Sequence, residues 1–307
     1  MKILILGSNG LVGSSLKRIL GVNKKFELFP STRLDTNLFD LNETKKLIEN
    51  VKPDVIINAA AKVGGIVANN TDRTQFILEN LKININLLES LIPFNNIKLI
   101  NLGSSCIYPL NSPNPINESN LMNGKLEPTN SPYAMAKLTA IEMGDALSKQ
   151  YGHVIINLMP TNLYGPNDNF SDKSSHVIPG LIKRLTIAKH NQEEIFKVWG
   201  TGTPKREFLH VDDLSDAIQF LIKKNLSPKI INVGSGQEIS IKELVSKLVR
   251  IISYEGKVIF DTSMPDGNPR KLLDSSIINN LGWSHSINLE DGLEQTYNWF
   301  KENEFNL

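Results

Sequence analysis

Tyr133 and Lys137 form a Y-x-x-x-K pair in the segment SPYAMAK. On a helix, a spacing of four residues places both side chains on one face. Tyrosine ordinarily titrates near pH ~10, and a neighbouring ammonium favours the phenolate. We therefore expect Lys137 to lower the pKa of Tyr133, so that the tyrosine exchanges a proton with a carbonyl oxygen while Lys137 contacts a nicotinamide ribose. The position of the pair makes the motif more specific, because it follows a serine-containing strand end and lies about 125 residues after a glycine-rich loop.

A second group of reactive side chains is expected beside this pair. Ser104 and Cys106 follow an apolar run in LGSSCIYP, and an extended segment would point both side chains into one pocket. A thiol titrates near pH ~8.5 and can remove an acidic proton alpha to a ketone. His176, in SSHVIPG, would protonate the opposite face of the resulting enolate. The alternatives are a small buried cysteine and a surface or capping histidine.

A glycine-rich loop near the amino terminus predicts a dinucleotide site. Its glycines have G-x-x-G-x-x-G spacing, directly after an apolar strand and at the start of a helix. A phosphate needs close backbone approach and is attracted to the free amides of a helix N-terminus. The alternative is a glycine-rich turn without a ligand. The predicted contacts are Gly7, Ser8, Asn9, Gly10, Leu11, Val12 and Gly13.

The second strand indicates which dinucleotide binds. An NAD enzyme usually has an acid at the end of this strand, for the ribose 2′-hydroxyl. Here the segment reads FELFPSTRLD, so that no acid ends the strand and Arg33 follows. A guanidinium can hold the 2′-phosphate of NADP by paired hydrogen bonds, which predicts NADP(H). A solvated Arg33 is the alternative, and Asp35 leaves NAD as a minority hypothesis.

Apolar strands and amphipathic helices alternate through the first half of the chain, which predicts an α/β fold of the Rossmann type. Continuous apolar strands such as DVIINAAA fit a doubly wound parallel sheet buried on both faces. We predict an NADP-binding domain over residues 1–160 and a smaller α/β substrate domain over 161–307, partly interleaved with the first. The expected strands are 2–6, 26–29, 54–61, 98–102, 154–159, 230–233 and 257–260, and the expected helices are 11–20, 41–50, 73–91, 131–151, 178–189, 211–223, 241–252 and 289–302.

Composition narrows the class of protein. The 307 residues carry a formal net charge of +1, which gives no electrostatic drive towards nucleic acid or a membrane surface. No stretch approaches the 18 apolar residues of a membrane span, and no set of residues suggests a metal site. With one cysteine no internal disulfide can form, which fits a reducing compartment. We expect a cytoplasmic enzyme.

Several long segments together resemble the GDP-L-fucose synthase family of extended short-chain dehydrogenases. These segments are AAAKVGGIVANN, LGSSCIYP, LEPTNSPYAMAK, MPTNLYGPNDNF, SHVIPGLIKR, VWGTGTPKREFLHVDD and PDGNPRKLLD. The resemblance implies NADPH, a homodimer, and two stages at one site, namely epimerisation of a GDP-linked keto sugar at C3 and C5 and reduction at C4. It departs from the family at Asn9, where bacterial members often have an arginine that helps to hold NADP.

The resemblance also implies roles for individual residues. Tyr133 would be the reductive acid with Lys137 as its partner, Ser104 would orient the substrate oxygen, and Cys106 and His176 would be the epimerisation base and acid. Around the cofactor it implies Leu102, Gly103, Ser104, Ser105, Pro160, Thr161, Asn162, Leu163 and His176. For the GDP-sugar it implies Arg184, Trp199, Arg206, Asp266 and Lys271, although core or solvated positions remain alternatives.

Two other functions stay open at this point. A 4-reductase of a related GDP-keto sugar, such as a deoxyheptose, would share the fold, the Ser/Tyr/Lys set and the GDP contacts without epimerising. A non-catalytic NADP-binding sensor would bind NADPH without turnover. Such sensors tend to lose the tyrosine or the lysine, and both are present here.

Overall fold

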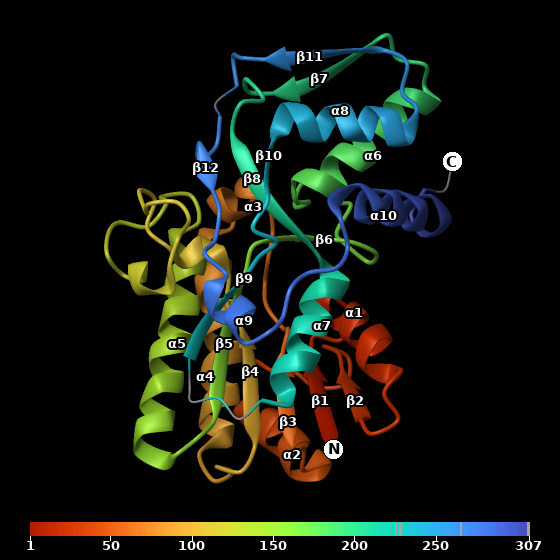
Figure 1. The fold of residues 1–307 in the computed structure, drawn as a ribbon. Coiled ribbons are helices and arrows are strands. Elements are labelled where there is room, and N and C mark those ends of the chain that lie inside the picture. Colours follow the sequence, from red (N-terminus) through yellow and green to blue (C-terminus); the bar gives the residue numbers. More distant parts are fainter. Residues whose placement is uncertain (225, 227–228, 265, 306–307) are drawn as a thin grey trace.

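The computed structural model describes residues 1–224, 226, 229–264 and 266–305 (Figure 1). A six-stranded parallel sheet has the order β2-β1-β3-β4-β5-β9. The chain winds from β1 to β2 on one side and then to β3 on the other, which is the doubly wound arrangement predicted. These strands are β1 (Lys2–Leu6), β2 (Glu27–Ser31), β3 (Val55–Asn58), β4 (Lys98–Leu102), β5 (Ile155–Pro160) and β9 (Lys229–Val233).

Alternate side chains of each strand enter two different cores, which explains the continuous apolar runs. From β1, Ile3 and Ile5 pack towards α1 and α7, whereas Leu4 and Leu6 pack towards α2, α4 and α5. Figure 1 shows α5 on the left and α1 with α7 on the right of the sheet. These helices are α1 (Leu11–Gly21), α2 (Leu41–Val51), α4 (Arg73–Leu91), α5 (Ser131–Tyr151) and α7 (Val211–Ile222).

A second core lies above the first in Figure 1 and is built from the later part of the chain. It contains α6 (Val177–His190), α8 (Ile241–Ile252), α10 (Leu289–Asn303) and the parallel pair β7 (Ile195–Trp199) and β11 (Lys257–Asp261). A mixed sheet joins the two parts, with β8 (Lys205–His210) paired to β6 (Asn162–Tyr164), β10 (Glu238–Ser240) and β12 (Arg270–Lys271). The remaining short elements are α3 (Ile66–Thr71), α9 (Ser276–Asn280) and the 3₁₀ turns η1 (Ser105–Ile107) and η2 (Glu118–Asn120).

The two halves of the chain are interleaved. Both α7 and β9 return to the first core, and Ser215 on α7 hydrogen-bonds Ser15 on α1 with 2.6 Å between the hydroxyl oxygens. The later segments therefore close over the carboxyl ends of the parallel strands, where open α/β sheets bind ligands. Among the described residues, no helix is long and apolar enough to cross a membrane.

Candidate active site

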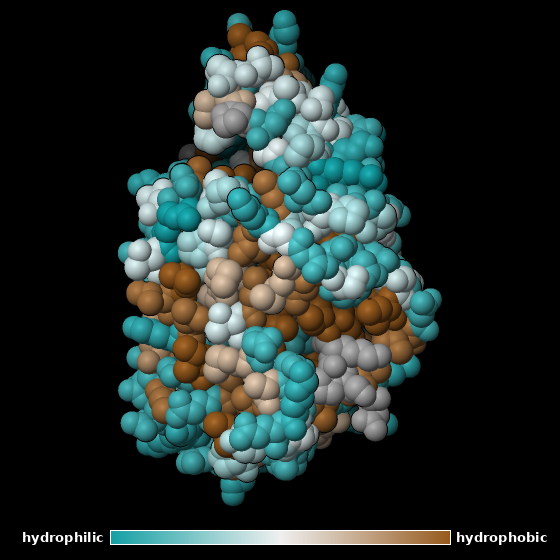
Figure 2. Space-filling view, turned by 90° about the vertical axis from the view of Figure 1, so that its left-hand side faces the viewer, coloured by the Kyte–Doolittle hydropathy of each residue, from teal (hydrophilic) through white to brown (hydrophobic). Residues whose placement is uncertain are grey.

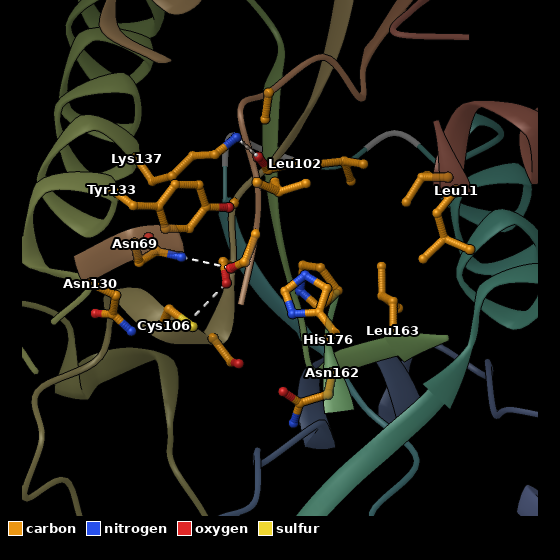
Figure 3. Close-up of a pocket in the computed structure, with 18 of the residues that line it drawn as sticks. Leu11, Asn69, Leu102, Cys106, Asn130, Tyr133, Lys137, Asn162, Leu163 and His176 are labelled. Atoms are coloured by element: carbon orange, nitrogen blue, oxygen red, sulfur yellow. Dashed lines mark hydrogen bonds between the residues drawn. The ribbon is translucent and has the colours of Figure 1, made fainter. Parts of the chain in front are cut away.

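One cavity of about 1090 Å³ runs between the two cores and collects most of the predicted site residues (Figure 3). It begins at the glycine-rich loop and extends past the ends of β4 and β5 to the segment around β12. Of the eighteen predicted cofactor contacts, sixteen line it. The other two, Ser8 and Gly13, do not.

Gly13 has a packing function in the structure. A Cβ on Gly13 would lie 2.2 Å from the carbonyl oxygen of Gly7, so that only glycine lets the helix approach the loop. Gly7 itself has φ +76°, a left-handed conformation that favours glycine. Ser8 is buried beneath the loop. The motif predicted a loop that lines the cavity, but its spacing could not separate the glycines that line the cavity from the one that packs.

The start of α1 is built to receive an anion. Gly10 precedes the helix, and no side chain caps its first amides. Four amides at a helix start lack intrahelical partners, and a phosphate is a natural acceptor for them. Orphaned buried oxygens elsewhere on the cavity wall, Asn69 Oδ1, Asn130 Oδ1 and Asp168 Oδ2, likewise lack partners within the described chain. These observations fit a bound dinucleotide and sugar nucleotide.

The region after β2 favours a 2′-phosphate. Arg33 lines the cavity with a side chain that is 74% exposed, and its guanidinium lies 4.0 Å from Glu79. Asp35 instead turns back, and its carboxylate accepts hydrogen bonds from the Thr32 amide at 2.8 Å and the Thr32 hydroxyl at 2.6 Å. Those bonds lower the pKa of Asp35 and hold it in a tight turn away from the cavity. The Asp35 carboxylate is thus bound to Thr32 and does not face the cavity, where an NAD enzyme would use it to hydrogen-bond the ribose 2′-hydroxyl.

Tyr133 and Lys137 lie on one face of α5, as predicted, but the lysine does not lower the tyrosine pKa. Burial raises the pKa of Tyr133, the charge of Cys106 raises it further, and a hydrogen bond with Ser104 opposes both. The Lys137 ammonium donates to the Leu102 carbonyl at 2.7 Å and lies 5.9 Å from the tyrosine ring centroid. Figure 3 shows Lys137 turned to Leu102 above the Tyr133 ring. The expected effect was wrong because the ammonium is held by a backbone oxygen.

Burial also acts on Lys137 itself. The residue is 2% exposed, and desolvation lowers its pKa to about 8. A buried ammonium is disfavoured unless it is paired, and the described residues offer it no carboxylate. Because burial raises its own pKa and no paired cation among the described residues opposes this, Tyr133 is a neutral phenol at neutral pH, which is the form that donates a proton.

Ser104 and Cys106 both reach the cavity, although the segment is not extended. Residues 105–107 form the 3₁₀ turn η1, and the Ser104 hydroxyl caps it by accepting the Cys106 amide at 3.1 Å. Local Ser–backbone bonding outcompetes the strand here. Cys106 is half-buried and its sulfur receives a hydrogen bond from Lys271 at 3.5 Å. Both side chains line one cavity, as the sequence predicted, but the extended conformation on which that prediction depended is wrong.

His176 stands on the opposite wall, where α6 begins (Figure 3). Its ring is exposed to the cavity but closely surrounded by protein, and this desolvation lowers its pKa. The imidazole is therefore neutral at neutral pH and can accept or donate a proton. The structure brings Tyr133, Cys106 and His176 to one space from three separate elements.

The five predicted GDP-sugar residues divide into two sets. Arg206, Asp266 and Lys271 line the cavity. Arg184 does not. It stacks on Phe196 and donates to the Lys197 carbonyl. Trp199 is 57% exposed at the end of β7, next to the loop where Asp266 accepts the Thr201 amide at 2.9 Å. Sugar-nucleotide roles for Arg184 and Trp199 remain predictions.

Three polar cavity residues with buried oxygens, unpartnered within the described residues, were not predicted from the sequence. Asn69 and Asn130 each have a buried side-chain oxygen without a partner, and Figure 3 shows both beside Tyr133 and Cys106. Asp168 is 8% exposed, and burial raises its pKa to about 7. Asn130 had a usable signal, because it starts the helix that carries Tyr133, one turn earlier. Nothing local distinguished Asn69 or Asp168 from ordinary loop polar residues.

Comparison with known proteins decides the family. The model of the NAD dependent epimerase/dehydratase family matches residues 3–234. The chain belongs to that family, in its GDP-L-fucose synthase branch. Putative GDP-L-fucose synthase 2 of Arabidopsis thaliana is 47% identical over 302 residues, covering 98% of this chain and 92% of the relative. GDP-L-fucose synthase of Escherichia coli is 44% identical over 312 residues, covering 99% and 97%.

Solved structures share the fold over the same length. A GDP-6-OMe-4-keto-L-xylo-heptose reductase from C. jejuni superposes with a TM-score of 0.91 at 32% identity, covering 99% of this chain and 98% of that one. A GDP-L-fucose synthetase from Naegleria fowleri bound to NADP gives 0.89 at 28% identity, covering 98% and 94%. The chain is thus nearer in sequence to the Arabidopsis thaliana and Escherichia coli relatives, at 47% and 44% identity, than to either of these two solved structures.

Proposed function

We propose that this enzyme converts GDP-4-keto-6-deoxy-D-mannose to GDP-L-fucose with NADPH, by epimerisation at C3 and C5 followed by reduction at C4. The observation that carries the proposal is the meeting of two proton-handling sets in one cavity. Ser104, Tyr133 and Lys137 form the set for reduction, and Cys106 and His176 form the set for epimerisation. The names and identities of the relatives support the same substrate.

The cofactor would lie along the cavity from the glycine-rich loop to the ends of β4 and β5. The free amides at the start of α1 would hold its pyrophosphate, and Arg33 its 2′-phosphate. Residues 102–105 and 160–163 would line the nicotinamide end. When bound, NADPH supplies the hydride for C4.

Epimerisation is the work of Cys106 and His176. The C4 carbonyl acidifies the neighbouring C–H bonds, so that the sulfur can take a proton and leave an enolate. His176, on the facing wall, would return a proton from the other side and so invert the carbon. Arg206 lies on the same wall as Cys106 and is positioned to balance the charge of the enolate.

Reduction is the work of Tyr133. Burial keeps its phenol protonated, and Ser104 lies within hydrogen-bonding reach of its hydroxyl. The phenol would give its proton to the C4 oxygen as that oxygen gains negative charge. Lys137, hydrogen-bonded to the Leu102 carbonyl, would fix the ribose end beside the tyrosine.

An experiment in deuterated buffer separates the two stages. The enzyme is incubated with GDP-4-keto-6-deoxy-D-mannose and NADPH, with absorbance and NMR followed together. GDP-L-fucose carrying deuterium at C3 and C5 is the expected product. A reduced sugar without deuterium there would support the 4-reductase alternative, and NADPH binding without oxidation would support a sensor.

The 4-reductase alternative is less well supported. A pure reductase has no need for a thiol and an imidazole facing each other across the sugar site, yet both line this cavity. The heptose reductase is also the more distant relative, at 32% identity against 44–47%.

We further propose that two copies pair through α4 and α5. Leu78 and Ile85 on α4 are 49% and 38% exposed, and Met135 on α5 is 45% exposed. Figure 2 shows apolar side chains gathered on this side of the molecule. Apolar helix faces of this kind are typical of homodimer interfaces. Sedimentation should give a dimer for the wild type and a monomer for Ile85→Lys, whereas Val22→Lys, at an exposed apolar residue elsewhere, should stay dimeric.

We also propose a cytoplasmic location, because Cys106 must stay a reduced thiol to act as a base.

A further inference from the structure

Lys271 occupies a position that a diphosphate contact does not explain. Its ammonium donates to the Cys106 sulfur at 3.5 Å. Within the described part of the chain, no carboxylate forms a salt bridge with Lys271. In the described part of the chain, the hydrogen bond of this ammonium goes to the side chain assigned as the epimerisation base.

The sheet built from β8, β10 and β12 fixes this contact. Lys271 on β12 pairs in register with Arg206 on β8, so that both cations project from neighbouring strands. Arg206 is held by backbone oxygens, since its guanidinium donates to the Lys205 carbonyl at 2.8 Å and to the Asn268 carbonyl. Lys271 remains the cation aimed at the sulfur.

The titratable groups around Cys106 come from four elements. Lys271 faces it from β12, Arg206 from β8, Tyr133 from α5 and His176 from the start of α6. Tyr133 and His176 are neutral at neutral pH. Asp266 offsets part of the Arg206 charge, so that Lys271 is the cation in direct contact with the sulfur. The thiolate, not the thiol, accepts a proton, and an adjacent lysine is a recognised way to favour the thiolate.

We propose that Lys271 is a positioning residue for Cys106, which holds the sulfur by an N–H···S hydrogen bond and favours its thiolate. This rests on the proposed function, in which that thiolate takes a proton from the carbon next to the C4 ketone. An S–H bond forms, the C–H bond breaks, and its electron pair moves to the C4 oxygen as an enolate. Lys271 keeps its proton throughout, so that its charge faces first the thiolate and then the enolate.

Thiol alkylation tests the proposal without any sugar. Cys106 is the only cysteine in the chain, so the rate of iodoacetamide labelling reports it alone. In Lys271→Met, labelling near neutral pH should slow about tenfold and the pH profile should move to higher pH, because the variant lacks the adjacent cation. Lys271→Arg keeps a cation and should stay close to the wild type.

A matched control comes from the same sheet. Lys205 on β8 is bonded to Glu238 at 3.3 Å and does not line the cavity, so Lys205→Met should leave the midpoint unchanged. If Lys271→Met changed only the high-pH plateau, the lysine would control access to the thiol, and the proposal would be wrong. An unchanged profile would also overturn it.

Solvent exchange then separates this role from the predicted diphosphate contact. With saturating GDP-4-keto-6-deoxy-D-mannose and no NADPH, deuterium entry at C3 and C5 should slow about tenfold in Lys271→Met near neutral pH. A higher KM with an unchanged maximal exchange rate would mean a substrate contact and would overturn the proposal. Because alkylation needs no substrate, a wrong sugar assignment would leave that result standing.

Discussion

The buried ammonium of Lys137 makes the stability of the folded chain depend on pH within a narrow window. Burial lowers its pKa to about 8 from an ordinary 10.5, and the residue is 2% exposed. Between these two values the unfolded chain binds more protons than the folded one. The free energy of unfolding must therefore rise as pH rises through this window, because the cost of burying the charge disappears.

The size of the effect follows from the two pKa values. Their difference corresponds to about 3 kcal/mol in total. The slope approaches ~1.4 kcal/mol per pH unit, so that about 2 kcal/mol is recovered between pH ~7.5 and ~9.5. Above that range the raised pKa values of the buried tyrosines Tyr108, Tyr133 and Tyr164 act in the opposite direction, because phenolates form more easily in the unfolded chain.

Urea unfolding of wild type and Lys137→Met, without cofactor, measures the Lys137 contribution. The variant lacks the titrating group but keeps the other groups, so the difference between the two pH profiles isolates the lysine. We expect wild type to gain about 2 kcal/mol relative to the variant between pH ~7.5 and ~9.5. Parallel profiles would refute the reasoning, because they would mean that the ammonium is as well solvated in the fold as in the unfolded chain.

Three substitutions test other parts of the site. Tyr133→Phe should lower NADPH oxidation about a thousandfold while deuterium exchange at C3 and C5 continues, whereas equal loss of both would contradict a role in reduction alone. Gly13→Ala places a methyl group 2.2 Å from the Gly7 carbonyl oxygen and should destabilise the fold by about 1–3 kcal/mol, while the Gly10→Ala control, at 3.6 Å from the same oxygen, should cost much less in thermal unfolding. Arg33→Met should weaken NADPH binding about tenfold or more in fluorescence titrations and leave NADH binding unchanged. Equal weakening of both cofactors would exclude the 2′-phosphate contact.

Much of the first core could be predicted from the sequence because its signals are local. The predicted bounds of strand 2–6 and of the helices at 73–91 and 131–151 agree with the structure to the residue. Asp40 caps α2 by accepting hydrogen bonds from the Asn42 and Glu43 amides at 2.8 and 3.0 Å, which is a local signal of the same kind. Two-sided burial gave the strands long apolar runs. The predicted third strand, 54–61, is longer than the observed β3, because residues 59–61 leave the sheet and line the cavity.

The second half could be predicted less well, because its elements are short and depend on distant partners. β6, β8, β10 and β12 are short strands of two to six residues whose pairing joins segments about 30 to 65 residues apart. No local pattern indicates such pairings, so the contact between Lys271 and Cys106 could not be inferred from sequence. The pKa of Tyr133 was mispredicted for a related reason, since burial depends on the whole fold.

The interleaving explains how one cavity can hold two kinds of proton chemistry. Reduction needs an acid that stays protonated, and Tyr133 has this property because α5 buries it against the first core. Epimerisation needs a base beside positive charge, and Lys271 and Arg206 bring that charge on strands of the later segment. Ser104 and Cys106 lie two residues apart on one segment, so the two sets meet there, while α5 brings the buried acid and the later strands bring the cations. The acid stays neutral because it is buried, and the base lies beside cations within reach of the same sugar ring.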